Sequence, residues 1–345
     1  MKRHAFRIGS IMLALLFLAS VGVWAGGSKE KAAGSSAAAS ASKHYTIAMV
    51  PKLIGVPYFN RAQEGAQKAA TDLGVTLDYT GPTTVDPAAQ VSAIEDLIAK
   101  GVNAIAVAPN DPASVTPVLM KARQAGILVM DFDTPADPNV VDYSIHQIDD
   151  QQYGEHIWDL LVKYMGSSGD YAIVTGGLSA ANLNSWIKSG ETYAKTKYPN
   201  LHLVTDPVAT DEKQQVAYQK TLDLFKAYPK LKGIVGISTP ASPGAAQAIE
   251  QLGLQGKIAN VGTSLPSMVK PFLADGSVSA ATLWDPAKLG YLTVYIAKQV
   301  LSGQKPTNGE SVPNVGTITL RPDGKTIVMG PPQDFTKDNV DLFPF

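Results

Sequence analysis

From residue 45 onward, short apolar runs alternate with longer segments whose apolar positions recur every three or four residues. The short runs are rich in Val, Ile and Ala and lack a polar-apolar alternation, which is typical of strands covered on both faces. We expect such strands at residues 45–50, 75–79, 104–108, 127–131, 170–174, 201–204, 233–237, 258–261 and 278–283. The pattern predicts an α/β protein built on parallel sheet.

The longer segments begin at proline or aspartate and stop at glycine. One segment, residues 87–100, begins at Pro87 and is followed by Gly101. Two further segments, 112–125 and 243–252, also begin at proline and are followed by glycine. Proline near the start of a helix and glycine just past its end are the expected signals. These segments therefore predict helices that connect the strands.

The first strand leads into a loop with candidate binding chemistry. The strand stops at Pro51, and Lys52, Tyr58 and Phe59 follow before a helix that we expect to begin near Asn60. In an open parallel sheet this loop lies at the carboxyl end of the strands, where ligands bind. A lysine supplies donors and the aromatic rings supply flat apolar faces. The alternative is a solvated lysine and a core phenylalanine, and this segment alone leaves both open.

The first residues predict export. Lys2, Arg3 and Arg7 precede an apolar stretch at 11–18, and Val23-Trp24-Ala25 fits a cleavage site, so residues 1–25 read as a signal peptide. The apolar stretch is shorter than the ~20 residues that span a bilayer. Residues 26–43 are mostly Gly, Ser, Ala and Lys, which predicts a disordered tether.

Composition removes several classes of function. The sequence has no cysteine, which excludes disulfides, thiol catalysis and a lipid anchor on an N-terminal cysteine. Its formal net charge of -1 gives no electrostatic reason to expect nucleic acid or an anionic membrane as partner. At ~150 residues per domain, the length suits about two domains after removal of the leader.

Two architectures fit the alternation: a two-lobed binding protein, or a barrel enzyme with eight strand-helix units. A barrel glycosidase needs two carboxylates on opposite sides of a bond. The candidate glutamates fall within predicted helices: Glu64, Glu95, Glu155, Glu191, Glu212 and Glu250. Asp131 and Asp133 alternate on one strand end and should point the same way. Histidines lack metal-ligand spacing, and no glycine-rich nucleotide motif occurs, so we expect no catalytic residue, metal or cofactor.

Together these segments resemble a known family. The stretches "PKLIGVPYFNRAQEGAQKAA", "GVNAIAVAPNDPASVTPVLMKARQAGI", "DFDT" and "TLWDPAKLGYLTVYIAKQVLSG" resemble the type I periplasmic sugar-binding proteins, especially the autoinducer-2-binding and rhamnose-binding subgroup. The resemblance covers residues 45 to about 331. It implies two doubly wound parallel-sheet lobes joined by a three-segment hinge. We expect residues 44–134 and 285–311 in one lobe, and 135–284 and 312–345 in the other.

The resemblance also implies ligand-binding positions. The family lysine of the first loop matches Lys52, the aspartate after the fourth strand matches Asp133, and the Trp-Asp pair of the late crossover matches Trp284 and Asp285. The family proline and alanine that offer backbone groups match Pro243 and Ala245. Asp131 is a weaker, hinge-type candidate.

The sequence departs from the autoinducer-2 binders at one point. Where those carry Asp-Gln before Asn-x-Trp, this chain has Asn182-Leu183 before Asn184 and Trp186. Asn182 keeps hydrogen-bonding capacity without the charge, whereas Leu183 is apolar if it faces the cleft. We therefore expect a small neutral monosaccharide, rhamnose first, with autoinducer-2 as the alternative and an exported glycoside-acting enzyme as a more remote one.

The resemblance implies a place of action and partners. The protein would be a monomer in the periplasm that delivers its ligand to the membrane subunits of an ABC importer. Related proteins also present ligand to chemoreceptors, and no residue decides whether this chain does. A transcription factor of related fold would carry a basic helix-turn-helix where this chain has its leader and tether.

Overall fold

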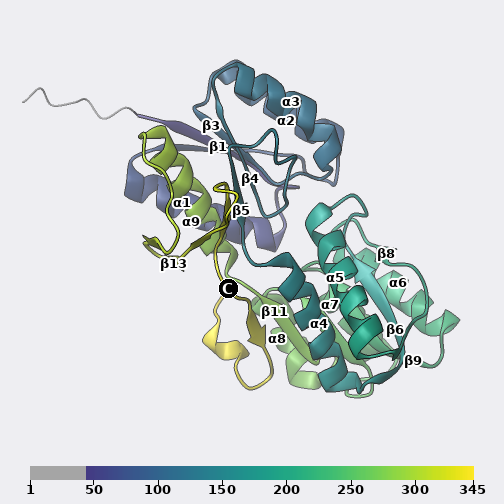
Figure 1. Ribbon diagram of the computed structural model, residues 1–345. Coiled ribbons are helices and arrows are strands. Elements are labelled where there is room, and N and C mark those ends of the chain that lie inside the picture. The colour runs from purple at the N-terminus through teal and green to yellow at the C-terminus, as the bar shows by residue number, and fades with distance from the viewer. Residues whose placement is uncertain (1–43) are drawn as a thin grey trace, which may run out of the picture. The chain divides into compact units, whose positions relative to one another are not determined.

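The computed structural model describes residues 44–345, which form two parallel-rich sheets with helices on their faces (Figure 1). The predicted signal peptide and tether lie outside the described residues. Among residues 44–345, the helices are too short or too polar to cross a membrane.

The first sheet has the strand order β14-β15-β5-β4-β3-β1-β2. Its members are β1 (Thr46–Val50), β2 (Thr76–Tyr79), β3 (Ala104–Val107), β4 (Leu128–Phe132), β5 (Tyr143–His146), β14 (Thr319–Leu320) and β15 (Thr326–Val328). Every pairing except β14 with β15 is parallel. Its helices are α1 (Pro57–Leu73), α2 (Pro87–Lys100), α3 (Pro112–Gln124) and α9 (Pro286–Leu301).

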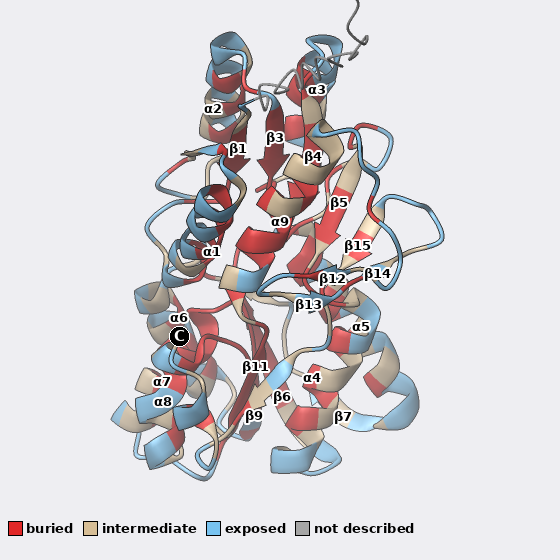
Figure 2. Ribbon diagram, turned by 90° about the vertical axis from the view of Figure 1, so that its left-hand side faces the viewer, coloured by how far each residue is buried: buried red, intermediate tan, exposed pale blue. Residues whose placement is uncertain are grey.

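Both faces of this sheet are covered, which explains its continuous apolar strands. Ile47 and Met49 pack in the core that includes α1 and α9, whereas Ala48 and Val50 pack in the core beneath α2 and α3. Successive strand side chains point to opposite faces, so both faces require apolar residues. The central strands β1, β3 and β4 are accordingly buried, and the outer helix surfaces are exposed (Figure 2).

The second sheet has the order β16-β11-β10-β9-β6-β7, with β8 paired to β6. Its members are β6 (Ser168–Thr175), β7 (Asn200–Leu203), β8 (Val208–Ala209), β9 (Leu231–Ile237), β10 (Ala259–Thr263), β11 (Ala280–Leu283) and the antiparallel β16 (Gln333–Phe335). Its helices are α4 (Asp150–Met165), α5 (Ala181–Lys197), α6 (Gln214–Ala227), α7 (Ala241–Gln251) and α8 (Pro266–Asp275). A small hairpin, β12 (Ser311–Val312) with β13 (Gly316–Thr317), and the short helix η1 (Val340–Leu342) complete the described chain.

Aspartate caps start several helices, as the sequence pattern indicates. Asp86 accepts hydrogen bonds from the backbone amides of Ala88 and Ala89 at the start of α2, and Gly101 closes that helix with φ 70°. A side-chain oxygen at this position satisfies amides that the first helical turn leaves free. The predicted boundaries of α2 are confirmed, whereas α1 begins at Pro57, so Tyr58 and Phe59 lie in its first turn rather than in the preceding loop.

The chain passes between the two sheets three times. Two of the lobe boundaries that we predicted from the sequence need correction. The crossings fall between β5 and α4, between β11 and α9, and between β15 and β16. We expected the first lobe to end at residue 134 and again at 311. However, β5 and β15 both belong to the first sheet, where Ile327 pairs with Ile145. The prolines and aspartates at 135–142 form a turn within the first sheet rather than the crossing itself.

Candidate ligand-binding site

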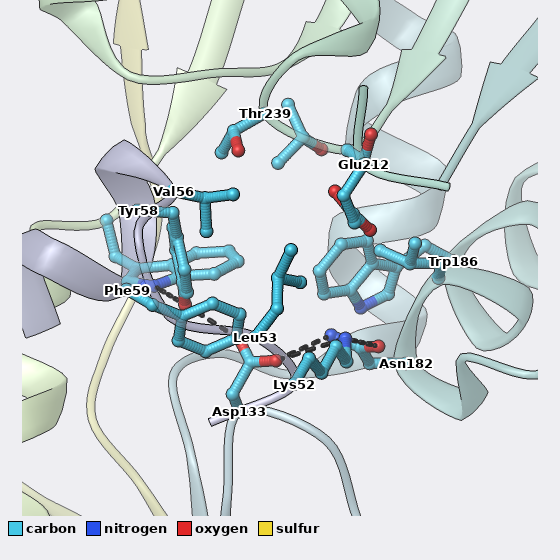
Figure 3. Close-up of a pocket in the computed structure, with 14 residues that line it drawn as sticks. Lys52, Leu53, Val56, Tyr58, Phe59, Asp133, Asn182, Trp186, Glu212 and Thr239 are labelled. Carbon is cyan, nitrogen blue, oxygen red and sulfur yellow. Dashed lines mark hydrogen bonds and ion pairs between the residues drawn. The ribbon is translucent and has the colours of Figure 1, made fainter. Parts of the chain in front are cut away.

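A cavity lies where the carboxyl ends of the two parallel sheets face each other. Its empty volume, with the open mouth included, is about 410 Å³. The lining residues are Lys52, Leu53, Val56, Tyr58, Phe59, Asp133, Asn182, Leu183, Trp186, Glu212, Ser238, Thr239, Thr263 and Trp284 (Figure 3). Strand-end positions supply much of this set, as expected for open α/β sheets.

One side of the cavity is a buried charged cluster. The Lys52 ammonium lies 3.2 Å from an Asp133 carboxylate oxygen and donates to the Asn182 side-chain oxygen at 2.9 Å. The Lys52 residue is 5 % exposed, Asp133 6 % and Asn182 1 %. The contact between Lys52 and Asn182 joins the two sheets. A buried lysine is stable here because it has both a counter-charge and hydrogen bonds.

Asp133 organises this cluster. Its Oδ1 accepts from the Tyr58 hydroxyl at 2.7 Å, and its Oδ2 accepts from the Thr134 hydroxyl at 2.9 Å and from the Asn182 amide at 3.4 Å. Together with Lys52, these donors engage most of the acceptor capacity of a carboxylate. Burial, together with the Asp133 charge, raises the pKa of Tyr58 well above its ordinary value, so Tyr58 stays a neutral donor.

Aromatic rings form a second part of the lining. Trp284 donates from its indole nitrogen to the Tyr58 hydroxyl at 3.0 Å, and its ring lies edge-on to Tyr58 and Trp186. Phe59 packs edge-on against Tyr58 with 5.0 Å between ring centroids. The sequence marks Phe59 as a possible flat apolar face and Trp284 as a ligand-binding position implied by the resemblance. Both rings line the cavity, and Trp284 also fixes the orientation of Tyr58.

Leu183 faces the cavity, which the sequence alone left open. It is 4 % exposed and contributes an apolar surface together with Leu53 and Val56. Trp186, one helical turn further along α5, lines the same region and donates its indole N–H to Asp150 at 2.7 Å. The cavity therefore combines a charged corner with apolar and aromatic walls.

Four predicted site residues do not lie on the cavity. Asp285 caps α9 through the Ala287 amide and pairs with Arg61 at 3.0 Å. Pro243 and Ala245 are buried within α7, where Ala245 belongs to the core behind the sheet. The fourth is Asp131. Residues that precede α7, Ser238 and Thr239, line the cavity instead.

Asp131 and Asp133 do not point the same way, contrary to the expectation from strand alternation. Asp133 has a φ of 62°, in the left-handed region, so the extended geometry ends before it. Asp131 instead accepts from the Ala136 amide at 2.7 Å and from the Ser144 hydroxyl, and so holds the turn that follows β4. Burial raises the pKa of Asp131 to about 6.

Glu212 is the main cavity residue that the sequence reasoning missed. We placed it inside a helix, but it lies in the turn before α6 with a φ of 58°. Ser238, Thr239 and Thr263 were also missed. The signal that could have found Ser238 and Thr263 is their place at the end of predicted strands β9 and β10, since that edge carries the site.

The polar groups of the cavity do not include a cluster of metal ligands from the described residues. Within residues 44–345, no three His, Asp or Glu side chains gather closely enough to hold a metal ion. The polar groups of the cavity are one ammonium, carboxylates, an amide and hydroxyls. Such a set can donate hydrogen bonds to a small polar molecule and accept hydrogen bonds from it.

Fold and cavity together define a two-lobed solute-binding protein. The chain belongs to the family described as periplasmic binding protein domain, whose model matches residues 47–305. Its relatives are solute-binding proteins rather than enzymes.

The names and titles of individual relatives mention different ligands. The chain is 26 % identical over 271 residues to the D-ribose/D-allose-binding protein of Pseudomonas aeruginosa, covering 75 % of this chain and 83 % of that protein. It resembles the structure of LsrB from Clostridium saccharobutylicum in complex with AI-2, with 28 % identity and a TM-score of 0.82, covering 87 % of this chain and 100 % of that one. A solute-binding protein of an ABC transporter from Clostridium phytofermentas with bound L-rhamnose gives 27 % identity and a TM-score of 0.82, covering 87 % and 98 %.

Proposed function

We propose that this protein captures a small neutral monosaccharide between its two sheets and delivers it to an ABC importer. A 6-deoxyhexose such as rhamnose is the first candidate, and other pentoses and hexoses follow. The observation that carries this proposal is the pairing, in one cavity, of a hydrogen-bonding corner at Lys52 and Asp133 with an apolar wall at Leu183.

Monosaccharides have the complementary chemistry. Their hydroxyl edges suit charge-assisted hydrogen bonds, each contributing about 1.5–3 kcal/mol, and their C–H faces suit aromatic rings such as Phe59 and Trp186.

Leu183 supports a deoxy sugar. A hydroxyl placed against Leu183 would lose water without gaining a partner, whereas a methyl group would not. The Leu53 and Val56 side chains extend the apolar surface. This arrangement favours rhamnose, whose sixth carbon is a methyl group, over fully hydroxylated hexoses.

The comparisons support a sugar ligand without singling out one. The relatives include proteins named for D-ribose and D-allose, and a similar structure holds L-rhamnose. The ligand positions Lys52, Tyr58, Phe59, Asp133, Asn182 and Trp284 are proposed on the cavity geometry. Export to the periplasm and contact with importer membrane subunits are part of the same proposal.

AI-2 is the second candidate, favoured by the likeness to LsrB in complex with AI-2. AI-2 is small and densely hydroxylated. Because Asn182 stands in place of an aspartate and Leu183 in place of a glutamine, the cavity wall loses one charge and one polar side chain. A site that leaves polar ligand groups unpaired discriminates strongly against them. We therefore rank AI-2 below a deoxy sugar.

Calorimetry tests this ranking. We expect the protein to bind L-rhamnose more tightly than D-ribose, and D-ribose more tightly than AI-2, all measured on one preparation. The Leu183→Gln variant should weaken L-rhamnose binding by about tenfold, as ~1.4 kcal/mol implies, and improve AI-2 binding. Leu178→Gln is the matched control, because Leu178 lies on the loop before α5 and is 62 % exposed. Tight AI-2 binding without a response to either sugar would overturn the choice.

A further inference from the structure

A second group of polar side chains lies on the side of the cavity away from Lys52. Figure 3 shows Glu212 and Thr239 across the cavity from Lys52 and Asp133. Ser238 belongs to the same side, because it directly follows β9 and precedes Thr239. We call Glu212 and Ser238 the distal pair.

The backbone holds Glu212 in place at a conformational cost. Asp211 and Glu212 both have positive φ, 49° and 58°, which is unfavourable for residues with a side chain. The buried Thr210 anchors the turn, since its hydroxyl and its amide both donate to the Thr175 carbonyl, at 2.8 and 3.0 Å. Two consecutive strained residues in a fixed turn point to a function for the side chain that they orient.

Space for the Glu212 carboxylate depends on a glycine. A Cβ at Gly176, which follows β6, would lie 2.0 Å from the carboxylate oxygen Oε1 and 2.9 Å from a methyl of Leu183. A side chain at that position would displace the Glu212 carboxylate and the Leu183 methyl from where they lie. Because Gly176 has no side chain, Glu212 and Leu183 can approach each other at the cavity wall.

Ser238 has hydrogen-bonding capacity beside the Glu212 carboxylate. Ser238 is 3 % exposed, and its hydroxyl makes no hydrogen bond of normal geometry, although it lies close enough to Glu212 to act on the pKa of that carboxyl group. A buried hydroxyl without a partner costs free energy, which a ligand hydroxyl would recover. The Lys52 corner differs, because Asp133 is already engaged by Tyr58, Thr134 and Lys52.

The charges around Glu212 disfavour an anionic ligand. No cation lies within 4 Å of Glu212 in the part of the chain that the structure describes. The charged groups that face it are Lys52, Asp133 and its neighbour Asp211. Burial raises the pKa of Glu212, and a further negative charge in the same cavity would raise it more. One lysine therefore faces three carboxyl groups, those of Asp133, Asp211 and Glu212.

We propose that Glu212 and Ser238 bind the hydroxyls at the end of the ligand away from Lys52, and that with Asp133 they restrict the site to uncharged sugars and exclude sugar acids and sugar phosphates. This inference rests on the proposed function and adds the residues that set the ligand class. Glu212 accepts from one ligand hydroxyl. Ser238 exchanges a hydrogen bond with a second.

Calorimetry with L-rhamnose tests the distal pair. Glu212→Ala and Ser238→Ala should each weaken binding at least tenfold, and Glu212→Gln, which keeps an acceptor and the shape, should weaken it less than Glu212→Ala. Glu95→Ala is the control, because Glu95 is exposed on α2 and pairs with Lys121. D-Glucuronate should bind at least a hundredfold more weakly than L-rhamnose to the unmodified protein.

The outcomes separate the two proposals. If the unmodified protein binds no neutral monosaccharide, the proposed function is overturned and this inference with it. Binding of L-rhamnose that stays within twofold in all three variants overturns the distal pair alone. Ser238→Ala and Glu212→Gln change little volume, so they remain informative if Glu212→Ala does not fold. D-Glucuronate binding as tight as that of L-rhamnose overturns the exclusion of anions.

Discussion

Replacing Asp133 with asparagine should weaken sugar binding by at least tenfold and up to about a hundredfold. The variant removes the counter-charge that lies 3.2 Å from the Lys52 ammonium, and breaking a buried pair costs about 3–5 kcal/mol in free energy. Part of this free energy is lost from ligand binding, because Asp133 is the group that holds Lys52 and Tyr58 in position beside the ligand. Asparagine tolerates the left-handed φ of 62°, so the backbone is expected to keep its path.

Titration calorimetry of this variant needs a control that leaves the cavity intact. Asp137→Asn removes a carboxylate in the same loop, where Asp137 caps the Asn139 amide outside the cavity. It should bind sugar within twofold of the unmodified protein. An Asp133→Asn variant that folds and keeps its affinity within twofold would show that the charged corner does not contact or position the ligand.

Replacing Gly290 with alanine should destabilise the protein by at least 3 kcal/mol. Helices α1 and α9 pack so closely that a Cβ at Gly290 would lie 1.9 Å from the carbonyl oxygen of Ala62, and one at Gly65 would lie 1.8 Å from that of Ala287. Both obstacles are backbone atoms, so the helices must separate. Overpacking commonly costs about 1–3 kcal/mol, and this contact is tighter than most. The gain in helix propensity, about 1 kcal/mol, does not offset it.

Urea unfolding measures the loss of stability in Gly290→Ala. Gln63→Ala is the control, because Gln63 is exposed on α1 and its replacement should change the free energy of unfolding by less than about 0.5 kcal/mol. The packing matters for function because α1 carries Tyr58 and Phe59 to the cavity. Separation of the helices would displace both rings. A Gly290→Ala variant as stable as the unmodified protein would contradict the close packing of α1 and α9.

The strands that build the two sheets could be predicted because two-sided burial requires continuous apolar runs. Residues 45–50, 104–108 and 233–237 coincide with β1, β3 and β9 to within two residues. The late strands were missed because β12 to β16 are only two or three residues long and partly exposed. Their membership in one sheet or the other depends on long-range pairing, such as that of Ile327 with Ile145, which no local pattern encodes.

The candidate site was partly predictable for a related reason. Lys52 and Asp133 follow recognisable strands, and a family resemblance marked both. The orientation of Asp131 could not be read from alternation, because the left-handed φ at Asp133 ends the strand geometry. Glu212 was assigned to a helix since nothing in its sequence neighbourhood indicates two consecutive residues with positive φ. Asp285 looked like a ligand group, but its carboxylate is engaged by Arg61 and by the helix that it caps.

Solution scattering tests capture between the two sheets most directly. The structure brings the sheets together through the hydrogen bonds from Lys52 to Asn182 and from the Ser179 hydroxyl to the Asn110 carbonyl, the latter at 2.9 Å. A bound sugar would add contacts to both sheets and favour this arrangement over an open one. We expect a smaller radius of gyration with saturating L-rhamnose than without it. An identical scattering profile with and without sugar, under conditions where calorimetry shows saturation, would contradict capture by closure.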